Sequence, residues 1–411
     1  MDKIIHPYIT NINNLKCVLV NFPCSEIVSA GFFLKIGSAY EEKSERGISH
    51  FLEHMLFKKR TNKLDELGIS YNAATSREYT YYECHGSTVQ AKQIINLLFL
   101  IMSQPAFEEK EIKNERNVIF EEMKSDNMSY SKKLYQDAIE NIYKNKNKDY
   151  AYPIIGDTNT LNNMNAKKLR EYFNKYYHYD NSTLVIVGNL DKDSILKYIK
   201  TLVNKYPRYG PKTHDINIVD GKIDKEVYIE RVKNLPQTMM MVNFYIENLS
   251  EIQKNRFTLL THILTGNFMS ILVNELRVKR GLCYSITSNT MLIKSNDTYS
   301  GIFFIKVDSD PSKIKECLRL ILHFILHKKI SKSAYINSKK SINNILSFSF
   351  QTSQDYLYYI GDMMLNNNTI FPRELMNVLK KTTLKDINDL LNIIKNGQLF
   401  VNAIGSFNSK K

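Results

Sequence analysis

The chain repeats one order of predicted strands and helices on the two sides of a short segment rich in proline and glycine. The segment runs from Tyr206 to Ile218, and its Pro207, Gly210 and Pro211 are typical of a linker. Before it, apolar runs and alternation predict strands at 16–21, 28–36, 69–74, 79–85 and 183–187. After it, the same patterns predict strands at 226–232, 238–245, 282–291 and 299–307. Each half also places a helix after its second strand, at 47–57 and at 251–273. The second half is therefore predicted to be a weak copy of the first.

The length of the chain favours two compact halves. At 411 residues it is too long for one ordinary core and suits two domains of about 200 residues each. We predict an N-terminal domain at 1–206, a linker at 207–222 and a C-terminal domain at 223–411. Further helices are predicted at 90–102, 108–124, 131–143, 166–176 and 191–205. Strands mixed with helices in this order indicate the α+β class.

The composition is that of a globular protein made and kept in a reducing compartment. Hydrophobic residues make up 43% and charged residues 24% of the chain. The longest apolar run, Ile94 to Met102, has the length of a buried helix and not of a membrane span. The first residues, MDKIIHPYITNI, contain neither a signal-peptide core nor an Arg-rich transit helix. The five cysteines are scattered, without a close pair of metal-binding spacing, which favours free thiols. We therefore expect a cytoplasmic or other reducing intracellular location and no membrane.

The net charge of +14 raises a separate hypothesis, because a basic surface can bind nucleic acid. Of the 56 basic residues 44 are Lys and 12 are Arg, as in a generic solvated surface, and no groove-reading motif is present. Nucleic-acid binding is therefore the weaker alternative. An amino-acid composition rich in Lys, Asn and Ile is typical of an AT-rich coding genome, such as that of a giant virus or an intracellular bacterium.

One segment carries a pattern with metal chemistry. Residues 47–57 read GISHFLEHMLF and place His50, Glu53 and His54 in the order H-x-x-E-H. Two imidazoles four residues apart on a helix lie on the same side about one turn apart, which suits them to share one tetrahedral zinc ion. Glu53 lies beside them and could take a proton from water at that ion. The alternative is an exposed polar face with incidental histidines.

Periodicity supports a helix in this segment. Its apolar residues fall at i, i+3, i+4, i+7 and i+8, which is the stripe of a helix that lies on a core. They are Ile48, Phe51, Leu52, Met55 and Leu56. At about 100° per residue, His50, Glu53 and His54 centre roughly opposite that stripe. The three polar groups are therefore predicted to face away from the core of their own helix.

A third metal ligand is expected from the helix predicted at 108–124, because catalytic zinc commonly takes three protein ligands. Glu115 and Glu122 lie two turns apart on the flank of its apolar side, which consists of Ile112, Ile119, Phe120 and Met123. A carboxylate at the border of a buried face is well placed to meet a metal. The alternative is a solvated acidic helix, since four further glutamates, Glu108, Glu109, Glu111 and Glu121, lie in the same segment.

The residues then match a known family in several places and in order. The chain resembles the pitrilysin or M16 family of zinc peptidases with the inverted motif. The matching pieces are HFLEHMLFK, NAATSREYTYY at 72–82, NERNVIFEE at 114–122 and ELRVKRGLCYS at 275–285. The resemblance covers most of the chain, is strongest from about Gly37 to Gly156 and is weaker after Lys205.

The resemblance implies roles for individual residues. Zinc would be held by His50, His54 and Glu122, at one ion per chain, with Glu53 as the general base and Glu115 as a supporting carboxylate. The edge strand that binds an extended peptide would be Asn72, Ala73, Ala74 and Thr75. Arg277 and Tyr284 of the second half would orient or polarise the scissile carbonyl. The copy of the metal helix in the second half keeps only His262 and is expected to bind no zinc.

The resemblance also implies a fold and an activity. Each domain would be a mostly antiparallel sheet covered by helices, and the two domains would form half of a clamshell chamber. The chain would be a zinc endopeptidase that hydrolyses peptides or unfolded segments inside it, as a homodimer or with a related subunit. A catalytically silent scaffold or partner subunit is the alternative, because some relatives have lost zinc.

The sequence departs from the family pattern at one place. The interval between His54 and Glu122 is shorter than usual, and the shortage falls between Phe57 and Asn72, in KKRTNKLDELGISY. Because a trimmed surface connection is tolerated better than a displaced ligand, the site is expected to remain intact. The departure concerns the rim of the cleft and therefore its specificity.

Overall fold

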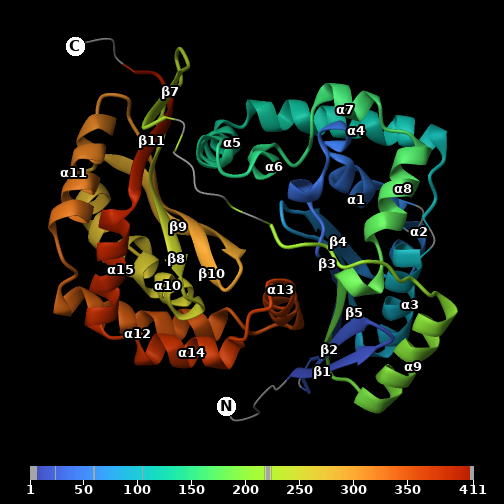
Figure 1. The fold of residues 1–411 in the computed structure, drawn as a ribbon. Coiled ribbons are helices and arrows are strands. Elements are labelled where there is room, and N and C mark those ends of the chain that lie inside the picture. The colour runs from blue at the N-terminus through green and yellow to red at the C-terminus, as the bar shows by residue number, and fades with distance from the viewer. Residues whose placement is uncertain are drawn as a thin grey trace. The chain divides into compact units, whose positions relative to one another are not determined.

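The fold consists of two compact units, each built on one sheet (Figure 1). The computed structural model describes residues 7–23, 25–58, 61–103, 105–216, 218, 223 and 225–407. The first unit comprises residues 1–124, 152–216 and 349–369. The second comprises residues 125–151, 217–348 and 370–411. None of the described helices is both long and apolar enough to cross a membrane.

The first unit contains a six-stranded sheet in the order β1-β2-β6-β3-β5-β4. The strands are β1 (Pro7–Ile12), β2 (Leu15–Asn21), β3 (Ile27–Leu34), β4 (Ser70–Thr75), β5 (Thr80–Ser87) and β6 (Ser182–Gly188). All neighbouring pairs are antiparallel except β2 with β6. β4 is an edge strand that pairs with β5 alone among the described strands, in agreement with the predicted edge at Asn72 to Thr75.

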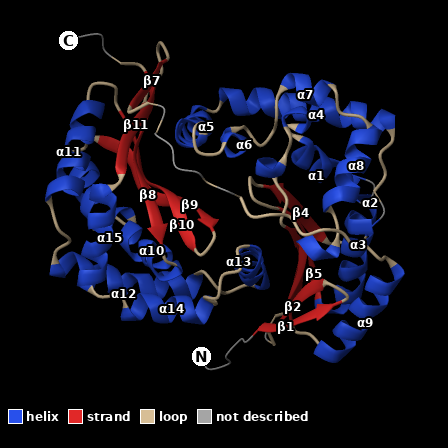
Figure 2. Cartoon of the chain, in the orientation of Figure 1, coloured by secondary structure: helices blue, strands red, loops and turns tan. Residues whose placement is uncertain are grey.

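Helices cover both faces of this sheet (Figure 2). They are α1 (Ile48–Lys58), α2 (Thr61–Glu66), α3 (Ala91–Ser103), α4 (Glu109–Met128), α7 (Thr158–Asn162), α8 (Ala166–Tyr176), α9 (Lys192–Lys205) and α13 (Ser353–Leu365). Short 3₁₀ turns lie at Ser38–Tyr40, Lys43–Glu45, Thr88–Gln90 and Tyr179–Asn181. Alternation along β3 separates the faces. Phe32 meets Phe99 of α3, whereas Phe33 points to the opposite face, where α13 lies. Both faces of the sheet therefore carry buried aromatic side chains.

The second unit contains a five-stranded sheet in the order β7-β11-β8-β10-β9. The strands are β7 (Val227–Arg231), β8 (Thr238–Leu249), β9 (Cys283–Ser295), β10 (Thr298–Ser309) and β11 (Gln398–Gly405). The helices are α5 (Tyr130–Tyr143), α6 (Lys148–Ala151), α10 (Glu251–Thr265), α11 (Ile314–His327), α12 (Lys332–Phe348), α14 (Pro372–Lys381) and α15 (Leu384–Asn396). A π-helix, η5, spans Val273–Lys279. Here too the faces alternate, because Phe303 contacts Phe257 of α10 and Phe304 contacts Tyr135 of α5.

The two sheets have one topology. β2, β6, β3, β5 and β4 correspond in order and direction to β7, β11, β8, β10 and β9. In both sheets the first of these pairs is parallel and the others are antiparallel. The predicted repeat and the α+β class are thus confirmed, and β1 is an addition of the first half.

Two helices cross the division predicted from the sequence. The strands of the first sheet lie before residue 206 and those of the second lie after residue 223, but α5 packs on β8 and β11 of the second unit and α13 packs on β3 and β6 of the first. The compact units therefore differ from contiguous domains at 125–151 and 349–369. The cause is burial, because each sheet has two faces with buried side chains and one of them is covered by a helix from the other half of the sequence.

The helix predicted at 251–273 is wrong in its extent. α10 ends at Thr265, and Gly266 caps it with its N–H on the carbonyl of His262. A turn follows at 267–270, where the Ser270 hydroxyl donates to the same carbonyl. A Cβ at position 266 would lie 1.9 Å from Nδ1 of His262, so the close approach requires glycine.

The linker and the stretch after Phe57 were predicted, whereas several other elements were not. The predicted linker has no helix or strand at 207–216, while 217 and 219–222 lie outside the described residues. The elements after 307 and the strand β1 had no counterpart in the predicted set. The shortened stretch after Phe57 contains α2, a helix of only 6 residues.

Candidate metal centre

The predicted metal helix is α1, and its apolar stripe is buried as expected. Ile48, Phe51 and Leu52 are 0% exposed, Met55 is 3% and Leu56 is 4% exposed. His50, Glu53 and His54 lie on the other side and are partly exposed. The stripe holds the helix on the core, so the polar groups are presented on a rigid element.

A buried carboxylate holds the beginning of α1. Glu41 is 1% exposed and accepts hydrogen bonds from the backbone N–H groups of Gly47 and Ser49, both at 2.8 Å. Burial raises the pKa of Glu41 to about 7, against the opposing effect of these hydrogen bonds. Gly47 has φ of +87° and lies against the carbonyl of Ile155, which fixes the entry of the chain into the helix. Nothing in the sequence distinguishes Glu41 from its acidic neighbours Glu42 and Glu45, and only its burial identifies it.

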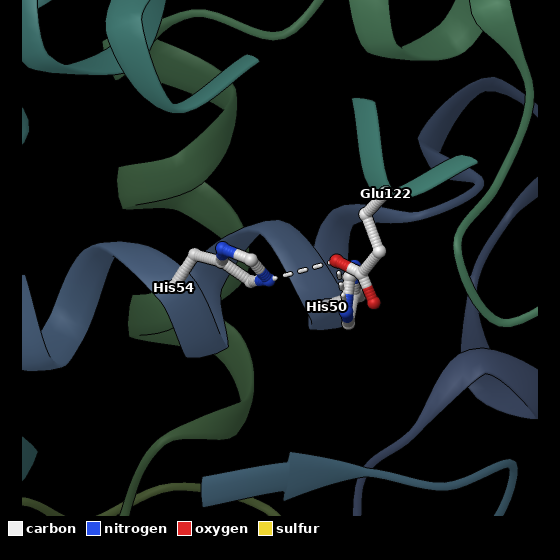
Figure 3. A group of neighbouring side chains, drawn as sticks. All are labelled: His50, His54 and Glu122. Carbon is white, nitrogen blue, oxygen red and sulfur yellow. Dashed lines mark ion pairs between the residues drawn. The ribbon is translucent and has the colours of Figure 1, made fainter. Parts of the chain in front are cut away.

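α4 brings the third group of the set to α1. The ligand atoms of His50, His54 and Glu122 all lie within 4.8 Å of one another (Figure 3). Oε2 of Glu122 is 3.7 Å from Nε2 of His50 and 3.5 Å from Nε2 of His54. This is the group of His, Cys, Asp and Glu side chains in the described residues that could hold a metal ion. The structure therefore brings together the three residues predicted as ligands.

Glu115, two turns before Glu122 on α4, holds the second histidine. Its Oε1 lies 2.9 Å from Nδ1 of His54, so Nε2 of that ring is directed to Glu122. The other oxygen of Glu115 accepts from Lys58, whose ammonium group also lies 3.3 Å from Glu111. Glu115 is 8% exposed, so these contacts are largely removed from water. A carboxylate on the far nitrogen of a metal-binding His is a recurrent arrangement that orients the ring.

The pKa shifts agree with this pairing. The hydrogen bond from His54 lowers the pKa of Glu115, and Lys58 lowers it further. Burial lowers the pKa of His54, but Glu115 and the charges of Glu53 and Glu122 outweigh it, and the net shift is upward. Lys58 was not predicted as part of the site, although it stands at the end of HFLEHMLFK.

Glu53 is tied to the edge strand. Its Oε2 accepts a hydrogen bond of 2.8 Å from the hydroxyl of Thr75, the last residue of β4. Burial raises the pKa of Glu53, and the hydrogen bond from Thr75 opposes that shift. The candidate base and the predicted peptide-binding strand are therefore connected by one side chain.

The two remaining predicted residues lie in the second unit. Arg277 belongs to the π-helix η5, and its guanidinium lies 5.1 Å from the ring centre of Phe268 and 5.6 Å from that of Tyr284. Tyr284 is 70% exposed, so it is a surface residue and not part of a core. The structure thus brings Arg277 and Tyr284 together with each other, and their role toward the candidate metal centre stays a prediction.

The counterpart of the metal helix in the second unit is α10. Its His262 is 6% exposed, and Nε2 lies 2.5 Å from the hydroxyl of Ser341 on α12. Burial lowers the pKa of His262. This histidine is a hydrogen-bonded core residue.

Comparison with known families agrees with the motifs. The family model described as insulinase, peptidase family M16, matches residues 16–157. The model described as peptidase M16 inactive domain matches residues 163–340. The chain belongs to peptidase family M16. The two models match the two halves in sequence order, and the metal helix with α4 lies in the first.

Relatives of this M16 chain cover it almost from end to end. The uncharacterised zinc protease YmxG of Bacillus subtilis is 27% identical over 401 residues, which are 92% of this chain and 93% of that protein. The beta subunit of the mitochondrial-processing peptidase of Saccharomyces cerevisiae is 23% identical, over 91% of this chain and 85% of that protein.

Solved structures share the fold. The peptidase M16 inactive domain from Pseudomonas fluorescens superposes with a TM-score of 0.86 at 15% identity, and 99% of each chain is covered. A protease from Helicobacter pylori gives a TM-score of 0.83 at 17% identity, over 98% of this chain and 100% of that one. At these identities the likeness concerns the M16 fold alone.

Proposed function

We propose that the protein is a zinc-dependent endopeptidase with one zinc ion per chain. The observation that carries this proposal is the convergence of His50, His54 and Glu122, with Glu53 beside them and Glu115 on the far nitrogen of His54. The names of the relatives as zinc proteases support it. The retention of the full set argues against the alternative of a silent scaffold.

The residues present fit zinc. Two imidazole nitrogens and one carboxylate oxygen are a common catalytic donor set that leaves one position open. Donors about 2 Å from a tetrahedral zinc lie roughly 3.3 Å from one another. The separations of 3.5 and 3.7 Å to Glu122 are close to that value, so small side-chain adjustments are sufficient.

Bound zinc would supply a Lewis acid that lowers the pKa of a water molecule and polarises a peptide carbonyl. Glu53 is then placed to accept the proton of the attacking water and to return it to the leaving amine. Thr75 holds the carboxylate of Glu53 in position through its hydroxyl. Glu115 holds the ring of His54, and Lys58 holds Glu115.

The substrate proposed is an extended peptide or an unfolded segment. The free edge of β4, Asn72 to Thr75, would bind it by main-chain hydrogen bonds that make little demand on sequence. Arg277 and Tyr284 would orient the scissile carbonyl, in a chamber completed by a second copy or by a related subunit. The four described cysteines, Cys17, Cys84, Cys283 and Cys317, are free and buried, which supports a reducing compartment as the proposed location.

Metal analysis tests the first part of the proposal. Purified protein is expected to contain about one zinc per chain, and a chelator is expected to remove both the metal and the hydrolysis of unfolded protein. Protein that takes up no zinc under any loading condition would exclude the proposed function.

The Glu53→Gln variant tests the second part. It is expected to bind zinc as the wild type does and to lose at least about a thousandfold in kcat, because the base is removed while the three ligands stay. Zinc content and peptide hydrolysis are measured on the same preparation. Undiminished hydrolysis would show that the base is another group, and zinc without hydrolysis in the wild type would favour the scaffold.

A further inference from the structure

The helix α13, contributed by the second half of the sequence, covers the face of the first sheet opposite α3 (Figure 1). Its Gly361 lies so close to the ring of Phe33 that a Cβ would meet that ring at 2.2 Å. Leu357 and Ile360 of α13 are at most 1% exposed. The helix is therefore packed firmly onto the sheet that carries the candidate peptide-binding edge.

A chain of polar groups is buried under α13. The hydroxyl of Ser353 lies 2.8 Å from that of Ser29 on β3, and the Ser29 hydroxyl lies 2.8 Å from Nδ1 of His85 on β5. Nε2 of His85 is 3.5 Å from the carboxylate of Glu83. Ser29 and Glu83 are 0% exposed, and Ser353 is 2% exposed. Burying a carboxylate without hydrogen-bond partners destabilises the folded state. We therefore expect the contacts of Glu83 to contribute to the stability of this region.

Tyr358 of α13 joins this buried group to the edge strand. Its hydroxyl donates a hydrogen bond to Oε1 of Glu83, accepts one from Gln354 at 3.0 Å and also interacts with the side chain of Asn72. Its ring contacts that of Tyr81 at 5.7 Å. Asn72 of β4 stands directly opposite Glu83 of β5 in the strand register, so the three side chains lie on one face.

The opposite face of β4 is held by the metal helix. Thr75 donates to Glu53, and the ring of Tyr71 lies 5.2 Å from that of Phe57 at the end of α1. β4 has only β5 as a described neighbour in the sheet. Its position relative to Glu53 therefore depends on side chains on both faces, with Tyr358 on one and Thr75 on the other.

We propose that Tyr358 is a positioning residue for substrate, which holds Asn72 and thereby the free edge of β4 in register with Glu53. The proposal rests on the proposed peptidase function. A peptide added to this edge takes its position from β4, and displacement by about 1 Å is enough to impair a reaction whose groups must meet at about 3 Å. The hydroxyl of Tyr358 acts through the strand and does not touch the reacting atoms.

The test compares Tyr358→Phe with the wild type in the zinc-loaded full chain, with fluorescein-labelled casein as substrate. Loss of one hydrogen-bonding group is expected to raise KM roughly three- to tenfold and to change kcat by less than about twofold. Zinc content is expected to stay the same. Tyr356→Phe on the same helix is the matched control, because its ring contacts Phe22 and Phe350, away from β4, and its KM is expected not to change.

A second variant distinguishes an effect of Tyr358 on substrate binding from an effect on the stability of the protein alone. Tyr358→Phe leaves the carboxylate of Glu83 buried without its donor, and Glu83→Gln added to it removes that charge. The double variant is expected to recover the melting temperature of the wild type while KM stays raised, because Asn72 still lacks its partner. Recovery of KM together with the melting temperature would overturn the proposal.

Binding measured without hydrolysis distinguishes this proposal from the proposed function. Anisotropy of labelled casein is recorded on Glu53→Gln and on Glu53→Gln with Tyr358→Phe. Weaker binding in the double variant upholds the positioning role even if the wild type proves inactive. Equal binding of both overturns the role even if hydrolysis is confirmed, and no binding by either excludes both ideas.

Discussion

Two helices occupy the same place in the two units and carry different chemistry. α1 lies between β3 and β4, and α10 lies between β8 and β9, in sheets of one topology. α1 faces α4, which brings Glu115 and Glu122 to its two histidines. α10 faces α12, which brings Ser341 to its single His262. The same pair of helices thus forms a candidate metal centre in one unit and a buried hydrogen bond in the other.

The difference shows that the fold brings two helices together at equivalent positions, and that the side chains at their contact determine whether a metal could bind there. Both histidines on α1 are partly exposed, and each has a carboxylate partner, whereas His262 is buried with a neutral partner. A neutral hydrogen bond stabilises a core, but it offers no negative charge to a cation. The N-termini of the two helices also differ. The buried carboxylate of Glu41 accepts hydrogen bonds from the backbone at the start of α1, whereas an exposed capping box begins α10.

The largest expected effect separates the two histidines. His54→Ala is expected to lose zinc and at least about a thousandfold in hydrolysis, because one of the three proposed ligands is removed. His262→Ala is expected to keep zinc and activity and to lower the free energy of unfolding by about 1–3 kcal/mol, through the cavity and the lost hydrogen bond to Ser341. Metal content, hydrolysis and denaturant melts measure the three quantities. Loss of zinc in His262→Ala would break the comparison.

The next effect concerns Glu115, which contacts the proposed ligand His54. Glu115→Gln is expected to weaken zinc affinity by roughly ten- to a hundredfold, because the amide orients the ring of His54 less well and does not raise its basicity. Competition with a chelator measures the affinity. Glu121→Gln on the same helix is the control, since Glu121 is exposed and pairs with Lys124. If the two variants bind zinc equally, Glu115 has no role in the metal centre.

The smallest effect tests the helix beginnings. Glu41 has a pKa of about 7 in the folded protein against an ordinary value of 4.5. Between these values the folded state holds a proton that the unfolded state releases. Stability therefore falls by up to about 1.4 kcal/mol per pH unit as pH rises through this window.

Glu41→Gln does not titrate, so the stability of the wild type relative to this variant is expected to fall from pH 4.5 to 7. Ser250→Ala, at the capping box of α10, is expected to cost about 0.5–2 kcal/mol at both pH values. Urea melts at several pH values measure both. A stability difference for Glu41→Gln that is flat with pH would show that folding does not raise the pKa of Glu41.

Local patterns predicted more of this protein than did long-range ones. The stripe of α1 and all strands except β1 and β11 follow from local periodicity, and the structure confirms them. The prediction that one helix continues through Gly266 was wrong. The apolar residues keep a helical spacing on both sides of Gly266, but α10 ends there, where Gly266 packs closely against His262. The exchange of α5 and α13 was not predicted, since amphipathic helices do not specify which sheet they cover.

The sequence by itself determined the repeated order of strands and helices and the side of α1 on which His50, Glu53 and His54 lie. Those are consequences of spacing, and a helix or strand with a given period presents the same face whatever surrounds it. Tertiary structure alone decided that Glu122 reaches both histidines, that Thr75 holds Glu53 and that Tyr358 meets Asn72. These interactions join residues 22 to more than 200 positions apart, and only the packing of whole elements brings such residues close together.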